Sequence, residues 1–398
     1  MGFDTERLGR VAELADRYVA DGKLAGAQVQ VAHQGKVALR HTVGRSDVAT
    51  DRPLADDAIY RIYSMTKPIT SVALMQLYEQ GRFLLEDPVE AFLPEFADPQ
   101  VWVGGSLTQP ITRPAQTVMT VKDVLCHTSG LTYGFFFQNN VDAMYREDNL
   151  GNFGLPEQSL EEAIKALATK PLVFDPGTAW NYSMSTDVCG RLVEVISGQS
   201  LDDYIAEHVT GPLGMNDSAF HVPEDKADRF TTLYVTTPGS LLTPMEPFDQ
   251  SRYLQPPVML SGGGGMVGTL DDYQRFADML LNGGELDGER IIGRKTLEYM
   301  TLNHLPEGKT LNELGQSTFS EAVMNGMGFG LGFSTLVEPA ANGAVSSYGE
   351  FAWGGAASTA FWVDPVEEIT CVFMTQFLPS SHYPIRRELK ATVYQALD

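Results

Sequence analysis

A serine and a lysine separated by one helical turn are the first candidates for chemistry in this sequence. Ser64 and Lys67 stand between an extended segment, 59–63, and a stretch at 69–80 whose apolar residues recur at helical spacing. One turn of helix places the Lys67 amine on the same face as the Ser64 hydroxyl, where an unprotonated amine can take its proton during attack on a carbonyl. A helix N-terminus also favours the negative charge that develops there. The spacing also arises by chance, so the neighbouring motifs must decide its meaning.

Tyr182 is the second candidate. It follows a Pro-Gly turn at 176–177 and an aromatic residue, Trp180, which together indicate a rigid loop. A phenol beside the Lys67 ammonium can act as a general base or acid. The alternative is a tyrosine that only packs in the core.

The third candidate is Trp353-Gly354-Gly355-Ala356, expected on the strand that opens a C-terminal hairpin. Two glycines inside a strand usually mark a place where a ligand or another backbone approaches closely. The backbone N–H of Ala356 is then available to donate to an oxyanion. A plain β-bulge is the alternative.

Together, these motifs resemble those of the serine β-lactamase and penicillin-binding-protein superfamily, in which Ser-x-x-Lys, a tyrosine motif and a Lys-Thr-Gly-like motif converge on one site. Other segments are similar to the class C branch, namely 81–88, 125–131, 176–177 and 262–265. The resemblance runs nearly the full length of the chain. It implies an α+β fold of the β-lactamase/DD-peptidase type, with an antiparallel sheet flanked by helices and a mainly helical domain.

The resemblance also implies the roles of the site residues. Ser64 would be the nucleophile, and Lys67 and Tyr182 would share the proton transfers. The backbone N–H groups of Ser64 and Ala356 would form the oxyanion hole. We further expect an apolar substrate-binding pocket lined by Trp353, Gly354, Gly355, Tyr133, Trp180, Met184 and Phe136.

Two departures from the class C pattern concern the substrate. Trp353 stands where those β-lactamases have a lysine, so a cation that would hold a substrate carboxylate is lost. Met184 stands where they have an asparagine, so an amide that would bind an acylamino group is lost. The Trp-Gly-Gly triplet and these losses are similar to family VIII carboxylesterases, which keep the fold but hydrolyse esters of small to medium acyl chains. This resemblance implies a cytoplasmic, cofactor-free serine carboxylesterase.

Three other functions remain open. A β-lactamase or D-amino peptidase would use the same Ser64, Lys67 and Tyr182. An acyltransferase would also use them, with an alcohol or a thioester partner in place of water. A non-catalytic binding homologue is a different class, and it predicts decay of the three residues, all of which are present.

Other motifs with chemical meaning are missing or out of context. The glycines at 263–268 match the spacing of a dinucleotide-binding loop, but two prolines at 256–257 curtail any strand before them. The sequence has no His-Glu-x-x-His, Cys-x-x-Cys or Gly-x-Ser-x-Gly motif, so neither a zinc site nor an α/β-hydrolase nucleophile is expected. His127 is interpreted as a structural residue at a helix end. No metal and no cofactor are predicted.

The hydrophobic pattern predicts the elements that must position these residues. An amphipathic helix is expected at 5–21 and a hairpin at 27–39. A second hairpin is expected from strands at 355–363 and 369–376. Further helices are expected at 69–80, 120–126, 159–169, 186–197, 201–208 and 270–282. Long loops are expected at 97–117, 133–158, 222–257 and 303–327.

These elements suggest two domains. An α/β domain would comprise 1–85 and 330–398, because both ends of the chain carry strands and a terminal helix. A mainly helical domain with long loops would comprise 86–329. The active site is expected between the two domains.

Composition limits the partners. The chain has 398 residues, a net charge of −23 and a pI near 4.6, which disfavour nucleic acid phosphates and anionic lipid membranes. The first ten residues lack the pattern of a secretion signal, and no apolar run of about 18 residues occurs. Three widely spaced cysteines suit a reduced, cytoplasmic protein. The expected partner is a small-molecule ester, and nothing indicates the oligomeric state.

Overall fold

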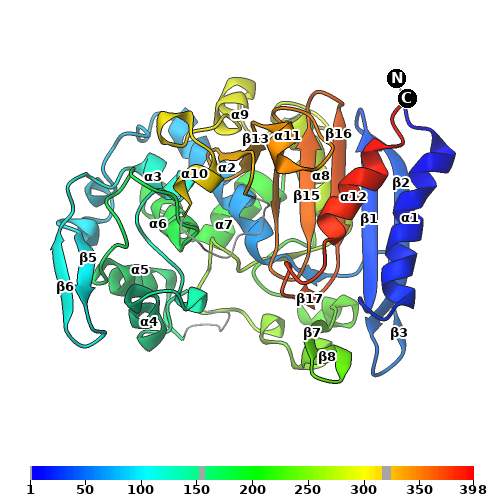
Figure 1. Ribbon diagram of the computed structural model, residues 1–398, viewed down its shortest axis with the longest axis horizontal. Helices are drawn as coiled ribbons and strands as arrows, with labels where there is room; N and C mark the ends of the chain where they lie inside the picture. The colour runs from blue at the N-terminus through cyan, green and yellow to red at the C-terminus, as the bar shows by residue number, and fades with distance from the viewer. Residues whose placement is uncertain (1, 152–156, 316–323) are drawn as a thin grey trace.

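An eight-stranded antiparallel sheet organises one side of the protein (Figure 1). The structure is a computed structural model that describes residues 2–151, 157–315 and 324–398. The strands lie in the order β12-β13-β14-β15-β16-β1-β2-β3. Their bounds are β1 Gly26–His33, β2 Lys36–Asp47, β3 Arg52–Pro53, β12 Met327–Phe329, β13 Ser334–Leu336, β14 Phe351–Gly354, β15 Ala360–Asp364 and β16 Ile369–Met374.

The two ends of the chain meet in this sheet. β1 pairs with β16, so that Gln28 faces Met374 across the strands. A bridge joins Phe3 to Leu397, and the two termini lie side by side (Figure 1). The alternating apolar residues of the two ends predict the hairpins β1–β2 and β15–β16, and both are present.

Helices cover both faces of the sheet. Its central strands carry apolar side chains on both faces, and these are buried by the helices. α1 (Thr5–Ala20) and α12 (Ile385–Tyr394) share a core with one face, which includes Phe373. α8 (Leu270–Leu281) packs against β15 and β16 on the other face, toward which Val372 points. The antiparallel sheet with flanking helices confirms the expected α+β class.

The remaining helices lie mostly beside the sheet (Figure 1). The central pair is α2 and α6, and α6 also contacts α3, α5 and α7. α2 is buried along most of its length, as its nearly continuous run of apolar residues requires. The bounds are α2 Thr66–Glu79, α3 Val121–Cys126, α4 Asn140–Glu147, α5 Leu160–Ala168, α6 Ser185–Ser197, α7 Leu201–Ile205 with a π-helical turn Ala206–Thr210, α9 Arg294–Met300, α10 Leu311–Leu314 and α11 Pro339–Asn342.

Short strands and 3₁₀ turns complete the described chain. The strands are β4 Tyr60–Arg61 with β9 Val267–Gly268, β5 Gln100–Gly105 with β6 Pro110–Pro114, β10 Glu285–Leu286 with β11 Glu289–Arg290, and the sheet β17 Phe377–Leu378, β7 Leu233–Thr237 and β8 Ser240–Glu246. The 3₁₀ turns are Tyr63–Met65, Val89–Ala91, Pro94–Phe96, Gly134–Phe136, Glu224–Arg229, Phe248–Gln250, Arg252–Leu254 and Pro306–Gly308.

The second predicted hairpin needs a correction. The expected strand at 355–363 is wrong in its first half, because β14 ends at Gly354 and β15 begins at Ala360. The intervening residues form a turn that is closed by a hydrogen bond of 2.9 Å from the Gly355 N–H to the Thr359 carbonyl. Trp353 and Gly354 therefore end a strand, and Ala356 lies in the turn.

The expected long loops contain secondary structure. The segment 97–117 holds the hairpin β5–β6, and 222–257 holds β7 and β8. The described part of 133–158 holds α4, and residues 152–156 lie outside the described chain. In 303–327, the described residues include α10 and the start of β12, and residues 316–323 lie outside the described chain. These elements are short, so their hydrophobic periodicity is weak.

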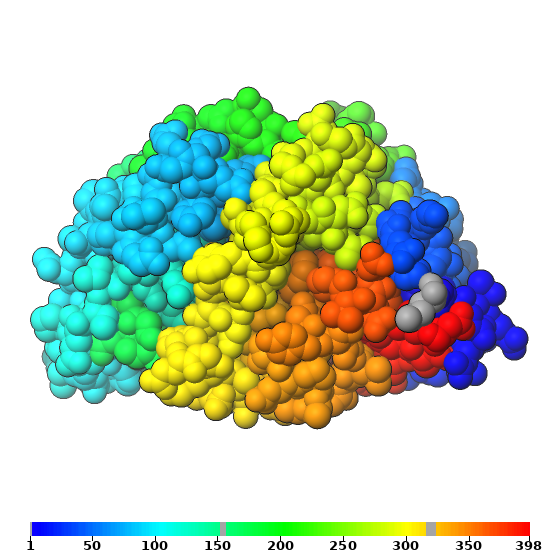
Figure 2. All heavy atoms as spheres, turned by 90° about the horizontal axis from the view of Figure 1, so that it is seen from above, coloured from blue at the N-terminus to red at the C-terminus, as the bar shows by residue number. Residues whose placement is uncertain are grey.

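The expected division into an α/β domain and a mainly helical domain stays a prediction. Two helices make contacts across its boundaries, since α2 packs against α6 and α8 packs against the sheet. The yellow segment that contains α9 lies between the cyan part of the surface and the orange part in Figure 2.

Candidate active site

Ser64 lies in a tight turn that leads directly into α2. The 3₁₀ turn Tyr63–Met65 precedes Thr66, the first residue of the helix, and Tyr63 adopts a left-handed φ of 43°. The Thr66 hydroxyl accepts a hydrogen bond of 3.2 Å from the Met266 N–H, which fixes the start of the helix. Pro68 fits in this first turn because the first N–H groups of a helix have no partner within it.

The three residues selected from the sequence meet in one buried cluster. The Tyr182 hydroxyl donates to Ser64 Oγ at 2.6 Å, and Lys67 Nζ donates to the same oxygen at 3.2 Å. Lys67 Nζ also lies 4.5 Å from the centre of the Tyr182 ring. The side chains of Lys67 and Tyr182 are almost fully buried, and Ser64 is 8% exposed. This geometry brings a hydroxyl, an amine and a phenol within proton-transfer distance.

Backbone hydrogen bonds hold Tyr182 just before α6. The Asn181 N–H donates to the His127 carbonyl at 3.0 Å, and the Asn181 amide donates to the Leu131 carbonyl at 2.9 Å. The Met184 N–H donates to the Thr132 carbonyl at 3.2 Å. The loop that precedes α6 is therefore tied on both sides of Tyr182 to the segment that follows α3.

Aromatic rings surround Tyr182. The Trp180 ring is nearly parallel to it at 6.3 Å, and the rings of Trp353, Tyr133 and His127 lie 5.5, 5.3 and 5.0 Å away. These contacts restrict the phenol to one orientation.

His127 is part of the support and not of the Ser64 cluster. Its Nδ1 lies 3.2 Å from the Ser183 hydroxyl, and its backbone adopts a left-handed φ of 59° at the end of α3. Burial, together with the Lys67 charge, lowers the pKa of His127 well below its ordinary value. The imidazole is therefore uncharged at neutral pH.

Asp187 is a residue of this site that the sequence analysis missed. Lys67 Nζ donates to the Gly263 carbonyl at 2.6 Å, and the Gly263 N–H donates to the Asp187 carboxylate at 3.1 Å. The Ser261 hydroxyl donates to the same carboxylate at 2.5 Å. Burial raises the pKa of Asp187, and the Ser261 hydrogen bond and the Lys67 charge oppose that rise. An acidic residue among the apolar residues of the helix after Tyr182 was the available signal.

The turn that holds Ala356 lies against the chain segment that leads to Ser64. A Cβ atom on Gly355 would collide with the Ile62 carbonyl and with the Thr359 hydroxyl. Ala356 belongs to the same buried apolar cluster as Tyr63, the neighbour of Ser64. Within the described parts of the chain, no group accepts a hydrogen bond from the Ala356 N–H. The role of this N–H as an oxyanion donor stays a prediction.

The residues expected to line the substrate pocket fall into three groups: buried residues near Tyr182, the two glycines, and Phe136. Trp180, Trp353 and Tyr133 are buried and pack against the Tyr182 ring, and Met184 is also buried. The space beside Gly354 is occupied by Arg386, whose guanidinium would lie 2.6 Å from a Cβ atom at that position. Gly354 therefore leaves room for the Arg386 guanidinium, and Gly355 for the Ile62 carbonyl and the Thr359 hydroxyl. Their role in binding a substrate stays a prediction.

Phe136 lines an open cavity. The cavity measures about 600 Å³ and shares Ala356 with the candidate oxyanion turn. Its lining residues are Phe135, Phe136, Gln138, Val235, Thr236, Met245, Ala356, Leu378, Pro379 and His382. None of them carries a carboxylate, an ammonium or a guanidinium group, so the cavity presents a mainly apolar surface beside Ala356.

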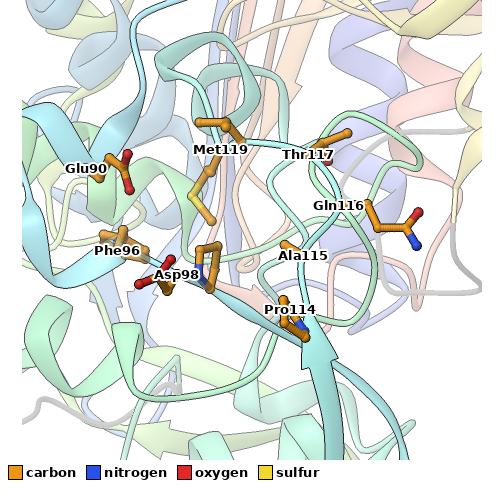
Figure 3. Close-up of a pocket in the computed structure, with 10 residues that line it drawn as sticks. Glu90, Phe96, Asp98, Pro114, Ala115, Gln116, Thr117 and Met119 are labelled. Atoms are coloured by element: carbon orange, nitrogen blue, oxygen red, sulfur yellow. The ribbon is translucent and has the colours of Figure 1, made fainter.

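A second cavity of about 220 Å³ lies at the base of the β5–β6 hairpin (Figure 3). Glu90, Asp98 and Thr117 are among its lining residues, and it shares none with the Ser64 cluster. In the described residues, no group of three or more His, Cys, Asp or Glu is placed to hold a metal ion. No helix in the described chain is long and apolar enough to cross a membrane.

Known proteins are similar to this chain over most of its length. Protein Rv1367c of Mycobacterium tuberculosis is 32% identical over 91% of this chain and 88% of its own. Esterase EstB of Burkholderia gladioli is 29% identical over 92% of this chain and 89% of its own. The structure of EstCE1, described as a hydrolase with promiscuous acyltransferase activity, has a TM-score of 0.83 at 24% identity, covers 98% of this chain and 99% of its own, and has the same fold.

The family model described as Beta-lactamase matches residues 11–395. This match includes Ser64, Lys67, Tyr182 and the turn at Ala356. It confirms the resemblance drawn from these motifs and the β-lactamase-type fold. The chain belongs to the beta-lactamase family.

Proposed function

We propose that this protein is a serine carboxylesterase that hydrolyses uncharged esters of small to medium acyl chains through an acyl-enzyme on Ser64. The observation that carries the proposal is the 2.6 Å hydrogen bond from Tyr182 to Ser64, with Lys67 3.2 Å from the same oxygen. A serine becomes a useful nucleophile only when a base stands within hydrogen-bond distance. The relative named Esterase EstB also supports ester hydrolysis.

The first half-reaction forms the acyl-enzyme. Ser64 Oγ attacks the ester carbonyl carbon, and its proton passes to the Tyr182 and Lys67 pair. The tetrahedral oxyanion accepts hydrogen bonds from the backbone N–H groups of Ser64 and Ala356. The bond to the alcohol oxygen then breaks, and the alcohol leaves with the proton from the pair.

The second half-reaction returns the free enzyme. A water molecule gives a proton to the same pair and attacks the acyl carbonyl, and the same two N–H groups hold the oxyanion. The bond to Ser64 Oγ breaks, Oγ recovers its proton, and the carboxylic acid leaves. Lys67 Nζ and the Tyr182 hydroxyl both lie within hydrogen-bond distance of Ser64 Oγ, so either group can hold the proton between the two steps.

The surroundings of Ser64 favour esters over β-lactams or D-amino peptides. Trp353, which takes the place of the lysine, packs its ring against Tyr182 and offers no cation to a substrate carboxylate. Met184 is buried and offers no amide. The lining of the cavity beside Ala356 contains no Asp, Glu, Lys or Arg, so a charged substrate group there would lose hydration without gaining a carboxylate, ammonium or guanidinium partner.

A cytoplasmic location is part of the proposal. Its support is the state of Cys126, Cys189 and Cys371, which are all buried and unbridged. The proposal includes no metal and no cofactor, and it predicts that EDTA leaves the activity unchanged.

The test is hydrolysis of p-nitrophenyl butyrate by the wild type and by Ser64→Ala, Lys67→Ala and Tyr182→Phe. Each variant should lower kcat by at least about 10³-fold. Ser71→Ala is the matched control, because Ser71 is a buried serine in α2, the helix that begins just after Ser64. A fluorophosphonate probe should label the wild type and Ser71→Ala but not Ser64→Ala. Full turnover by a folded Ser64→Ala protein would refute the mechanism.

The same assay separates the alternatives. Turnover of a β-lactam or of a D-amino peptide faster than that of the ester would make the protein a β-lactamase or peptidase. An ester product formed with an added alcohol in preference to the acid would make it an acyltransferase. A chain that neither turns over these substrates nor accepts the fluorophosphonate would be a binding protein.

A further inference from the structure

We propose that Arg386 is a positioning residue for the oxyanion hole. It acts through the peptide bond that joins Gly355 to Ala356, and the inference rests on the proposed serine esterase function. Arg386 belongs to α12, the last helix of the chain, which packs against the sheet and against α1. Nothing in the sequence motifs links this helix to Ser64.

Arg386 holds both ends of the turn that contains Ala356. Its Nη2 donates to the Gly355 carbonyl at 2.7 Å and to the Thr359 carbonyl at 2.6 Å. The Gly355 N–H closes the same turn by donating to the Thr359 carbonyl at 2.9 Å. Hydrogen bonds from a charged donor are about twice as strong as neutral ones. The Ser358 N–H also donates to the Gly355 carbonyl, at 3.1 Å. Arg386 therefore supplies the charged hydrogen bonds of a turn that backbone hydrogen bonds also close.

The first of these bonds is made to the peptide unit that would stabilise the oxyanion. The Gly355 carbonyl and the Ala356 N–H are the two ends of one amide group. A cation bound to the carbonyl oxygen draws electron density from the amide nitrogen, and hydrogen bonds in such a chain strengthen one another. Arg386 thus aims the Ala356 N–H and also makes it a stronger donor toward a developing negative charge.

Arg386 works from the side of the strand opposite to the reacting groups. Successive residues of a strand point to opposite faces. The Trp353 ring points toward Tyr182, 5.5 Å away, whereas the position of a Gly354 side chain is taken by the Arg386 guanidinium, 2.6 Å from a Cβ atom there. Arg386 is therefore a positioning residue, and Gly354 is the residue that leaves room for it.

A small cavity beside Arg386 permits a specific test. It measures about 100 Å³, and its lining includes Trp353, Arg386 and Arg387. Removal of the Arg386 side chain enlarges this space, so that a free guanidinium ion has room to bind beneath the turn. Arg387 is the matched control, because it is the next residue of the same helix and its Nη2 donates to the Asn342 carbonyl, away from the turn.

The experiment compares Arg386→Ala, Arg386→Lys and Arg387→Ala with the wild type on p-nitrophenyl butyrate. Loss of a whole oxyanion donor costs about 10² to 10³ in kcat, so a weakened and misplaced donor should cost about 10 to 10². KM should stay within about twofold, because the neutral ester carbonyl gains little from the donor. Inhibition by a boronic acid that forms a tetrahedral adduct with Ser64 should weaken by the same factor as kcat falls. Arg387→Ala should match the wild type in all three.

Guanidinium chloride, below concentrations that unfold the protein, should restore part of the kcat of Arg386→Ala and leave Arg387→Ala unchanged. Arg386→Lys keeps the charge and should have a kcat between those of the wild type and Arg386→Ala. This variant also provides the test if the alanine variant does not fold. A folded Arg386→Ala protein with wild-type kcat would overturn the inference. So would a loss of kcat that guanidinium does not restore and that boronic acid affinity does not match. Inactivity of the wild type toward every ester would instead refute the proposed function.

Discussion

Asp187 and Lys67 contact Gly263 from opposite sides. The Gly263 N–H donates to the Asp187 carboxylate at 3.1 Å, and the Gly263 carbonyl accepts from Lys67 at 2.6 Å. A Cβ atom on Gly263 would lie 2.7 Å from an Asp187 oxygen, so the contact requires glycine. Asp187 thus fixes the backbone that holds the Lys67 amine near Ser64.

The first prediction is that Asp187→Ala lowers kcat by at least about tenfold, because a displaced Lys67 no longer meets Ser64 in the reactive geometry. Steady-state hydrolysis of p-nitrophenyl butyrate measures the effect, with thermal unfolding as the check on folding. Ser261→Ala is the control, since it removes the other donor to Asp187 and leaves the Gly263 hydrogen bond. Its kcat should stay within about threefold. Equal kcat values for Asp187→Ala and the wild type would show that Gly263 holds Lys67 without help.

The second prediction concerns one glycine in a crowded position and one in an open position. Gly355→Ala should lower the free energy of unfolding by about 1 to 3 kcal/mol, because its Cβ would collide with the Ile62 carbonyl and the Thr359 hydroxyl. Gly9→Ala should raise it by about 0.5 to 1 kcal/mol, because Gly9 lies inside α1 with nothing within 4 Å of a Cβ. Urea unfolding of both variants measures the two changes. The same sign for both would contradict these contacts.

The third prediction is a pH dependence of stability from Asp272. Burial raises the pKa of Asp272 to about 6, although Ser218 and the Asp217 N–H donate to it. Because the folded protein holds this proton more tightly than the unfolded chain, Asp272 contributes stability below about pH 4 that is lost as the pH rises through 6. The loss amounts to about 3 kcal/mol for a shift of this size.

Asp272→Asn should abolish that loss. Its free energy of unfolding, relative to the wild type, should rise between pH 4 and pH 7 in urea titrations. Asp271→Asn is the control, because Asp271 is the adjacent carboxylate, is exposed and pairs with Arg40. It should keep most of the loss, because burial contributes more than the Asp271 charge to the raised pKa of Asp272. A difference between Asp272→Asn and the wild type that stays constant with pH would contradict the raised pKa.

The fourth prediction concerns the cavity beside Ala356. At about 30 Å³ for each water-sized group, a butyryl chain fills roughly a fifth of its 600 Å³. Each further methylene that is buried should raise kcat/KM up to about fourfold. We expect this rise either in p-nitrophenyl esters of growing acyl length or in butyrate esters of growing alcohols, and the series that responds identifies the group in the cavity.

Met245→Trp tests the location of that group. Met245 is exposed and lines the cavity, so a tryptophan there should reduce turnover of the longest esters at least tenfold and leave p-nitrophenyl acetate within about twofold. Val366→Trp, on an exposed turn outside the cavity lining, should change neither. Equal losses for long and short esters would show that the cavity does not hold the substrate chain.

Local geometry explains what the sequence could predict. Ser64 lies in the 3₁₀ turn that leads into α2, and Lys67 follows three residues later in α2, so their meeting follows from one helical turn. The hairpins β1–β2 and β15–β16 follow from alternating apolar residues. The place of Tyr182 beside Ser64 could be predicted only from the family motif, because a single tyrosine carries no information about its partners.

Contacts between distant segments explain what the sequence could not predict. Asp187 and Gly263 are brought together by the packing of separate segments, and Arg386 reaches Gly355 from another helix. The turn at Gly355 was expected as a strand because its sequence shows no break other than glycine. The three-dimensional neighbours of that glycine, Ile62 and Arg386, decide its conformation.

The pairing of β1 with β16 has a consequence for synthesis of the chain. Gln28 leaves the ribosome early, whereas its partner Met374 is among the last residues to be made. At about 5 to 20 residues per second, β1 waits roughly 20 to 70 s for its neighbour. During that interval one edge of the β1–β2 hairpin has no strand beside it, and such edges pair readily with other chains. The yield of folded protein on expression should therefore vary with temperature and with chaperone level, because both act on the chain before β16 is made.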